Sequence, residues 1–111
     1  MGLQSVDDAS YVDQVLNAKG VVVVDFWAPW CGPCGMLGPV LEKAAETLPE
    51  NVKIVKYNVD ESQSVAQQLG VRGIPTLAVY KDGQLLAQQA GMMNSARFAA
   101  SLKQFVYNPA C

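Results

Sequence analysis

One stretch organises the chain: Val21-Val22-Val23-Val24-Asp25-Phe26-Trp27-Ala28-Pro29-Trp30-Cys31-Gly32-Pro33-Cys34. Its four valines and two following aromatic residues predict a strand buried on both faces, because β-branched and aromatic side chains pack well on a pleated surface. The two prolines lack an N–H group, so the strand should end near Ala28 and a helix should begin at Pro33 or Cys34. Both cysteines are therefore expected at the N-terminus of a helix.

The spacing of Cys31 and Cys34 suits a disulfide, because residues three apart on a helical turn share a face and lie close enough to be bridged. The free N–H groups and the helix dipole favour an anion there, which lowers the pKa of a thiol and raises its thiolate fraction. A thiolate is the nucleophile of disulfide exchange. We interpret Cys31, which a partner can reach, as the attacking thiol, and the partly covered Cys34 as the resolving thiol.

Other uses of the two cysteines are disfavoured. A structural staple across so short a loop would contribute only about 2 kcal/mol. A closed zinc site needs four ligands, whereas the chain has three cysteines and no histidine, so no metal is expected. Haem attachment would need a histidine after Cys34, where Gly35 stands, and Cys–His catalysis is excluded. The third cysteine, Cys111, is interpreted as a spare exposed thiol.

Asp25 is the polar residue within the apolar run. Between Val24 and Phe26 its carboxyl group should be desolvated, which raises its pKa and suits it to proton transfer with Cys34. The alternative is a carboxylate at a strand end, in contact with water. The flanking residues favour the functional interpretation.

The residues around the cysteines resemble the thioredoxin family. Trp30-Cys31-Gly32-Pro33-Cys34 reads like the active-site signature of that family. The resemblance covers nearly the whole chain, through Asp25-Phe26-Trp27-Ala28, Pro39, Lys56, Gly73-Ile74-Pro75-Thr76, Gly83 and Gly91. Two residues depart from it: Gly35, where the family usually carries Lys or Arg, and Gly38 beside Pro39.

The resemblance also implies the roles of the site residues. Cys31, Cys34 and Asp25 are the implied catalytic residues. The Ile74–Pro75 bond, which would otherwise be expected to be trans, is implied to be cis, to pack on the cysteine pair and to let a strand-like substrate pair with the backbone. The implied substrate-binding residues are Trp30, Gly32, Pro33, Gly73, Ile74, Pro75 and Gly91, with Trp27 and Lys56 in support. Trp27 and Trp30 suit packing and shielding of the site as well as they suit contact with a substrate.

Composition sets broader limits. The 111 residues suffice for one domain, which we expect to span 1–111. A net charge of −2 and a pI near 4.9 indicate neither a nucleic-acid partner nor, without a Lys/Arg cluster, a membrane surface. The N-terminal residues lack the basic and apolar regions of a signal peptide. We therefore expect a cytoplasmic monomer.

The first half of the chain predicts a parallel β-α-β unit. We expect a short strand over 3–6, a helix capped by Asp7 or Asp8 and ending at Gly20, the central strand, a helix over 34–48, and a strand over 52–57. The first helix should bury Val12, Val15 and Leu16. The second should present Leu37, Leu41, Ala44, Ala45 and Leu48 to the sheet, with a kink at Pro39. A helix between parallel strands implies a right-handed crossover.

The second half predicts an antiparallel β-β-α unit. A short helix over 62–69 leads through a loop to strands over 76–80 and 84–88, which flank the hairpin turn at Asp82-Gly83. Asn94 should cap a last helix with an apolar stripe of Phe98, Leu102, Phe105 and Val106, ending at Pro109. The two units together predict an α/β protein with a mixed sheet and helices on both faces, which is the thioredoxin fold.

The resemblance implies a protein disulfide reductase that needs no bound cofactor. Cys31 would attack a target disulfide, and Cys34, helped by Asp25, would release the reduced target. The implied partners are a flavin-containing thioredoxin reductase and disulfide-containing proteins. Two alternatives stay open: a disulfide oxidase or isomerase of the same fold, which Gly32-Pro33 disfavours, and a redox-inert binding subunit that uses the groove around Trp30, Ile74 and Gly91.

Overall fold

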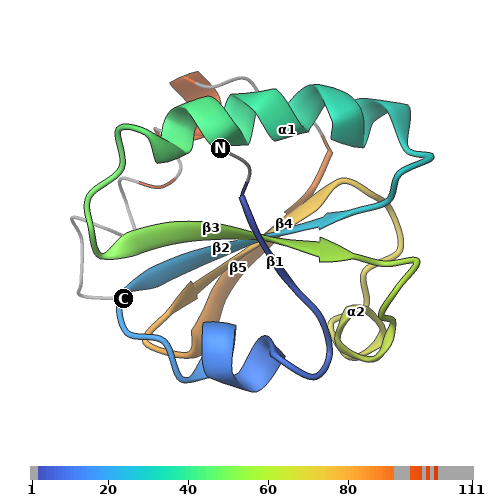
Figure 1. Ribbon diagram of the computed structural model, residues 1–111, viewed down its shortest axis with the longest axis horizontal. Coiled ribbons are helices and arrows are strands. Elements are labelled where there is room, and N and C mark those ends of the chain that lie inside the picture. Colours follow the sequence, from blue (N-terminus) through green and yellow to red (C-terminus); the bar gives the residue numbers. More distant parts are fainter. Residues whose placement is uncertain (1–2, 92–95, 99, 101, 103–111) are drawn as a thin grey trace.

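A five-stranded mixed sheet forms the centre of the computed structural model, which describes residues 3–91, 96–98, 100 and 102 (Figure 1). The strands are β1 (Gln4–Val6), β2 (Val21–Trp27), β3 (Val52–Asn58), β4 (Thr76–Lys81) and β5 (Gln84–Ala90). They lie in the order β1-β3-β2-β4-β5. β3 pairs in parallel with β1 and β2, whereas β4 pairs antiparallel with β2 and β5. The predicted thioredoxin fold is confirmed.

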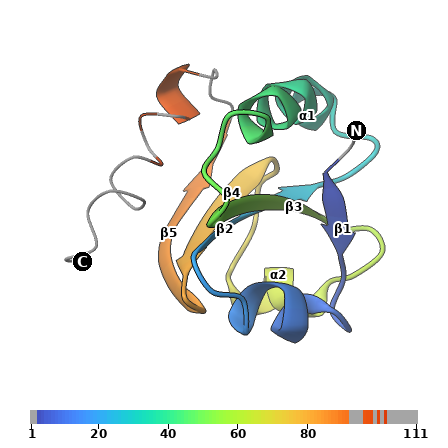
Figure 2. The same ribbon diagram turned by 60° about the vertical axis from the view of Figure 1, so that its left-hand side comes forward.

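Helices cover both faces of this sheet (Figures 1 and 2). The α-helix α1 (Gly32–Ala45) lies on one face and connects the parallel strands β2 and β3. The short helices η1 (Val12–Leu16) and α2 (Ser64–Gln68) lie on the other face. Among the described residues, no helix is long and apolar enough to cross a membrane.

The alternating side chains of β2 supply both layers of the core. Val21 and Val23 pack toward α1, where Leu37 and Leu41 are fully buried. Phe98 and Leu102 join the same cluster, as their apolar spacing predicts, whereas Asn94, Phe105, Val106 and Pro109 lie outside the described residues. Ala44 and Leu48 pack there as partly buried side chains. Ala45 is exposed, contrary to expectation, because α1 turns it away from the sheet.

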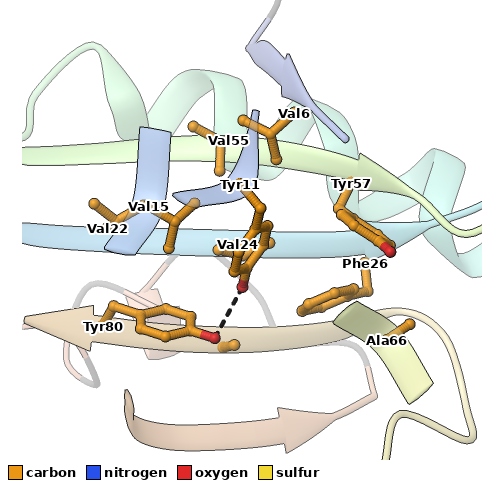
Figure 3. Packing of buried hydrophobic residues seen from close by; sticks show 11 residues of the cluster. Val6, Tyr11, Val15, Val22, Val24, Phe26, Val55, Tyr57, Ala66 and Tyr80 are labelled. Atoms are coloured by element: carbon orange, nitrogen blue, oxygen red, sulfur yellow. Dashed lines mark hydrogen bonds between the residues drawn. The ribbon is translucent and has the colours of Figure 1, made fainter. Parts of the chain in front are cut away.

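Three buried tyrosines and Phe26 dominate the opposite layer (Figure 3). The Tyr11 hydroxyl donates to the Tyr80 hydroxyl at 2.9 Å. The Tyr57 hydroxyl donates to Asp8 Oδ1 at 2.6 Å, at the rim of the cluster. The tyrosine rings therefore fill the core while their polar ends remain hydrogen-bonded, which avoids the cost of burying an unpaired hydroxyl.

The first helix differs most from expectation. It is a five-residue π-helix, and only Val15 is buried, whereas Val12 is 52% and Leu16 39% exposed. Its N-cap residue, Tyr11, makes no side-chain cap hydrogen bond. Asp7 Oδ1 instead accepts from the Ser10 N–H at 2.9 Å within the preceding turn. The wider π-turn separates residues that α-helical spacing would place on one face.

The hairpin follows the prediction, whereas the bounds of α1 and α2 differ from the predicted spans of 34–48 and 62–69. α1 begins at Gly32, earlier than expected, and runs through Pro39 to Ala45. α2 is shorter than the predicted span 62–69. The hairpin turn at Asp82-Gly83 is confirmed, with both residues at positive φ, 50° and 85°. A Cβ on Gly83 would collide with the Leu16 carbonyl oxygen, so this turn requires glycine.

Candidate active site

The cysteine pair lies where β2 leads into α1. The chain turns after Ala28, whose carbonyl oxygen accepts from the Cys31 N–H at 3.1 Å, and Cys31 becomes the N-cap residue of the helix. Pro33 fits the first turn because an N–H there would be unpaired in any helix. Cys31 and Cys34 form a disulfide with a Cα–Cα distance of 5.2 Å. The predicted bridge is confirmed.

The start of α1 presents its N–H groups to the cysteine sulfur. The Cys34 N–H points at Cys31 Sγ, 3.2 Å away, as a serine or aspartate cap would be contacted. In the reduced protein this contact, together with the helix dipole, favours a thiolate at Cys31. We expected Cys31 to be more accessible than Cys34. In the structure their exposure is almost equal, because Cys31 is 7% and Cys34 4% exposed.

The loop before β4 forms one wall around the disulfide. Ile74 is partly buried against Ala28, Cys31 and Cys34, and its carbonyl oxygen lies 3.8 Å from Cys31 Sγ. The Ile74–Pro75 peptide bond is cis, as expected. The Pro75 carbonyl oxygen accepts from the Gly91 N–H at 2.9 Å, which ties the end of β5 to this loop.

Gly73 and the residue after the cis bond complete that loop. The Thr76 hydroxyl, which is buried, donates to the Gly73 carbonyl oxygen across the cis peptide bond. The sequence assigned Thr76 no function beyond the resemblance. This hydrogen bond closes the loop over the cis peptide bond, and Gly73 itself is exposed.

Asp25 occupies the layer between the sheet and α1. It alternates with Val21 and Val23, and Cys34 shares a helical stripe with the buried Leu37 and Leu41. Asp25 is 1% exposed, and its Oδ1 has no hydrogen-bond partner. Burial raises the pKa of Asp25 to about 6, although the positive charge of Lys56 opposes the rise.

Lys56 on β3 and Trp27 on β2 lie near Asp25 and the cysteines. Lys56 is the register partner of Asp25 across the β2–β3 ladder. Its Nζ lies 4.1 Å from the centroid of the Trp27 ring, a cation–π distance. Trp27 is partly buried and packs on the cysteine cluster. The Trp27 ring therefore lies in contact with both the Lys56 ammonium group and the cysteine cluster.

Exposed side chains border the disulfide. Trp30 is 70% and Met36 69% exposed, while Gly32 and Pro33 are exposed as well. The Trp30 Nε1–H donates to Asp60 Oδ1 at 3.1 Å. The sequence reasoning overlooked Asp60, although Asn58-Val59-Asp60 after a strand is typical of an Asx turn. In the part of the chain that is described, no group of three His, Cys, Asp or Glu residues could hold a metal ion.

Comparison with known proteins identifies the family to which this chain belongs. The thioredoxin family model matches residues 2–106. The chain belongs to the thioredoxin family. It is 46% identical to the thioredoxin of Pseudomonas aeruginosa over 98 residues, which cover 88% of this chain and 91% of that protein. It is equally identical, over 98 residues, to thioredoxin 1 of Synechococcus elongatus, covering 88% of this chain and 92% of the relative.

The three-dimensional comparison gives the same result. A thioredoxin variant from Halobacterium salinarum superposes with a TM-score of 0.85 at 34% identity, covering 95% of this chain and 91% of that one. As a thioredoxin with a bridged Cys31–Cys34 pair, this protein is a protein disulfide oxidoreductase. The chemistry of the pair is dithiol–disulfide exchange.

Proposed function

We propose that this thioredoxin works as a single-domain cytoplasmic reductase of target disulfides, with Cys31 as the attacking residue. The contact of the Cys34 N–H with Cys31 Sγ at the helix start carries the proposal, because it favours the thiolate on Cys31. The Cys31 thiolate attacks one target sulfur and breaks the target disulfide. The sulfur that leaves takes up a proton, and a mixed disulfide remains on Cys31.

Cys34 then completes the exchange. Its thiol gives a proton to the Asp25 carboxylate, directly or through one water molecule, and attacks Cys31 Sγ. The mixed disulfide breaks, and the second target sulfur leaves as a thiolate. Two electrons have passed from the cysteine pair to the target, and Cys31–Cys34 is a disulfide as in this structure. A flavin-containing thioredoxin reductase would return two electrons to the pair without a cofactor bound to this chain.

We propose that the substrate docks on the surface around Trp30, Gly32, Pro33, Gly73, Ile74, Pro75 and Gly91. The exposure of Trp30 and Gly73 beside the disulfide supports this assignment. A target segment in extended conformation could pair with the loop backbone at Ile74, as peptides pair with free strand edges. Trp27 and Lys56 would support the site from below.

Trapping experiments test the division of labour between the cysteines. Cys34→Ser should accumulate mixed disulfides on Cys31, because the resolving thiol is missing, and mass spectrometry would identify the linked cysteine. Cys31→Ser should trap none. Adducts on Cys34 in the Cys31→Ser protein, with none on Cys31 in the converse protein, would reverse the assignment.

The reduction potential of the pair tests the direction of the reaction. The reduction potential is about −270 mV for thioredoxin and about −180 mV for protein disulfide isomerase. A potential near the first supports the reductase, whereas a potential near the second favours the oxidase or isomerase. A double Cys→Ser protein that retains its biological activity would instead indicate a binding subunit.

A further inference from the structure

Trp30 is both exposed and held in place. Its side chain is 70% exposed, yet its Nε1–H donates to Asp60 Oδ1 at 3.1 Å. An indole in contact with water can satisfy its single donor without a protein partner. Pairing the Trp30 N–H with Asp60 therefore contributes little to stability, because water would accept the same hydrogen bond. Its main consequence is that the ring keeps one orientation.

The segment that carries Asp60 is itself fixed at the end of β3. The Val59 N–H donates to the Trp27 carbonyl oxygen at 2.9 Å and so extends the β2–β3 ladder by one residue. Asn58 Oδ1 accepts from the Asp60 N–H at 2.9 Å, and the Asn58 carbonyl oxygen accepts from two following N–H groups at 3.1 Å. The Asp60 carboxylate is thus presented by a hydrogen-bonded turn.

This turn lies next to the reacting sulfur atoms. Val59 and Trp27 pack on the cluster of Ala28, Cys31 and Cys34, and Trp30 directly precedes Cys31 in the chain. Asp60 and the indole therefore form part of the rim that a protein substrate must contact before its disulfide reaches Cys31. A small disulfide reaches the sulfur without covering that rim.

We propose that Asp60 is a positioning residue that orders the Trp30 ring for the docking of protein substrates. The inference rests on the proposed reductase function. Ordering an aromatic side chain before binding removes the entropy cost of ordering it on binding. Without Asp60, the substrate concentration that half-saturates the reaction should rise about three- to tenfold for a protein disulfide. The limiting rate of exchange should change far less.

The test compares two disulfides in single turnover. The full chain, reduced beforehand and freed of reductant, is mixed with excess insulin or with hydroxyethyl disulfide. Asp60→Ala should lower the ratio of the second-order rate constants, insulin over hydroxyethyl disulfide, about three- to tenfold, through half-saturation and not through the limiting rate. Asp60→Asn keeps an acceptor oxygen and should restore the ratio. Glu61→Gln is the matched control, since it removes the neighbouring exposed charge.

Two further measurements separate positioning from a general structural effect. In Trp30→Phe, which lacks the indole N–H, Asp60→Ala should lower the ratio no further. Hydrogen exchange of the Trp30 indole N–H, followed by NMR, should be faster in Asp60→Ala than in the wild type and Asp60→Asn. If Asp60→Ala folds poorly, Trp30→Phe alone still tests the inference, because it lacks the hydrogen bond to Asp60 and should lower the ratio to a similar extent; an unchanged ratio in Trp30→Phe would contradict the inference.

Three results would overturn the inference. An unchanged ratio in Asp60→Ala, with an active wild type, would show that the ring needs no positioning. An equal loss in Asp60→Asn or Glu61→Gln would assign the effect to charge. A loss for Asp60→Ala in the Trp30→Phe background would assign it to another contact. A wild type that reduces neither disulfide would instead refute the reductase function itself.

Discussion

At Asp25, folding and chemistry place opposing demands on one carboxyl group. The group is buried beneath α1 with an unpaired Oδ1, which makes its ionised form unfavourable. Burial raises the pKa to about 6 against the attraction of Lys56. A carboxyl group with such a pKa can exchange protons near neutral pH, which an ordinary exposed aspartate does poorly. The same burial therefore lowers the stability of the fold at neutral pH and suits Asp25 to its proposed role in proton transfer.

Asp25→Ala should therefore stabilise the fold at pH 7 and slow release of the mixed disulfide. The folded pKa of about 6 exceeds the unfolded value of about 3.9, so the folded state binds the proton more tightly. The contribution of Asp25 to stability is full below about pH 4 and is lost as the pH rises through about 6. Removing the ionised group should raise the free energy of unfolding by about 1–3 kcal/mol.

Denaturant unfolding of both proteins in one redox state, from pH 4 to pH 8, checks this expectation. The advantage of Asp25→Ala should grow with pH and nearly vanish at pH 4, where the wild-type carboxyl group is protonated. A denaturant midpoint at pH 7 that falls on substitution would mean that the buried carboxylate is stabilised by its surroundings.

At the scale of elements, the first turns of α1 carry three glycines where side chains would fit. Ideal Cβ atoms built on Gly32, Gly35 and Gly38 meet nothing within 4 Å. None of the three has positive φ, so their backbone does not require glycine. The turn of the β4–β5 hairpin is the opposite case, because Gly83 has positive φ and abuts the Leu16 carbonyl oxygen.

We expect Gly35→Ala and Gly35→Lys each to raise the free energy of unfolding of the reduced protein by about 0.5–1 kcal/mol. The gain comes from the lower entropy of the unfolded chain and better helix propensity. Gly83→Ala, the contrasting control, should destabilise by more than about 1 kcal/mol. Denaturant curves measure all three variants, and thiolate absorbance of Gly35→Lys against Gly35→Ala isolates the effect of the charge on Cys31. Destabilisation by Gly35→Ala would show a close contact at the start of α1.

At the scale of the whole molecule, Asp8 joins segments that are far apart in sequence. Its carboxylate accepts from the Tyr57 hydroxyl and from the N–H groups of Ser64 and Val65, at 3.1 and 3.2 Å. It thus caps α2 from more than fifty residues away, while Gln63, the residue before that helix, gives no side-chain cap. The hydrogen bond from Tyr57 and those from the α2 backbone hold the pKa of Asp8 below its usual value.

Asp8→Ala should destabilise the fold at pH 7 by about 1–2 kcal/mol, as loss of a helix cap does. Because the folded pKa lies below the unfolded value of about 3.9, the contribution is present above pH 4 and is lost as the pH falls through the folded pKa. The difference between wild type and variant should therefore shrink in acid. Asp7→Ala is the control, because the Asp7 carboxylate accepts its hydrogen bonds from Ser10 and Ala9 within its own turn. Equal unfolding curves for Asp8→Ala and wild type at pH 7 would show that α2 needs no distant cap.

The sequence alone determined the elements whose cause is local. The run of valines predicted the central strand, and Asp82-Gly83 predicted the hairpin. The cysteine spacing predicted the disulfide, since three residues of helix fix that distance. The resemblance supplied the cis bond at Pro75, which the local residues would not have indicated.

The tertiary structure decided what depends on contacts between distant segments. It oriented η1 so that Val15 is the one residue of that helix buried in the core. It also placed the Asp8 carboxylate at the N-terminus of α2 and not at the N-terminus of η1, the next helix in the chain. It covered both cysteines almost equally, because the loop of Ile74 packs on them, and it brought Asp60 to the Trp30 ring. Such pairings depend on how strands and helices pack, and no spacing along the chain encodes them. The cysteine pair could therefore be found from sequence, whereas its burial and the hydrogen bond between Trp30 and Asp60 came from the fold.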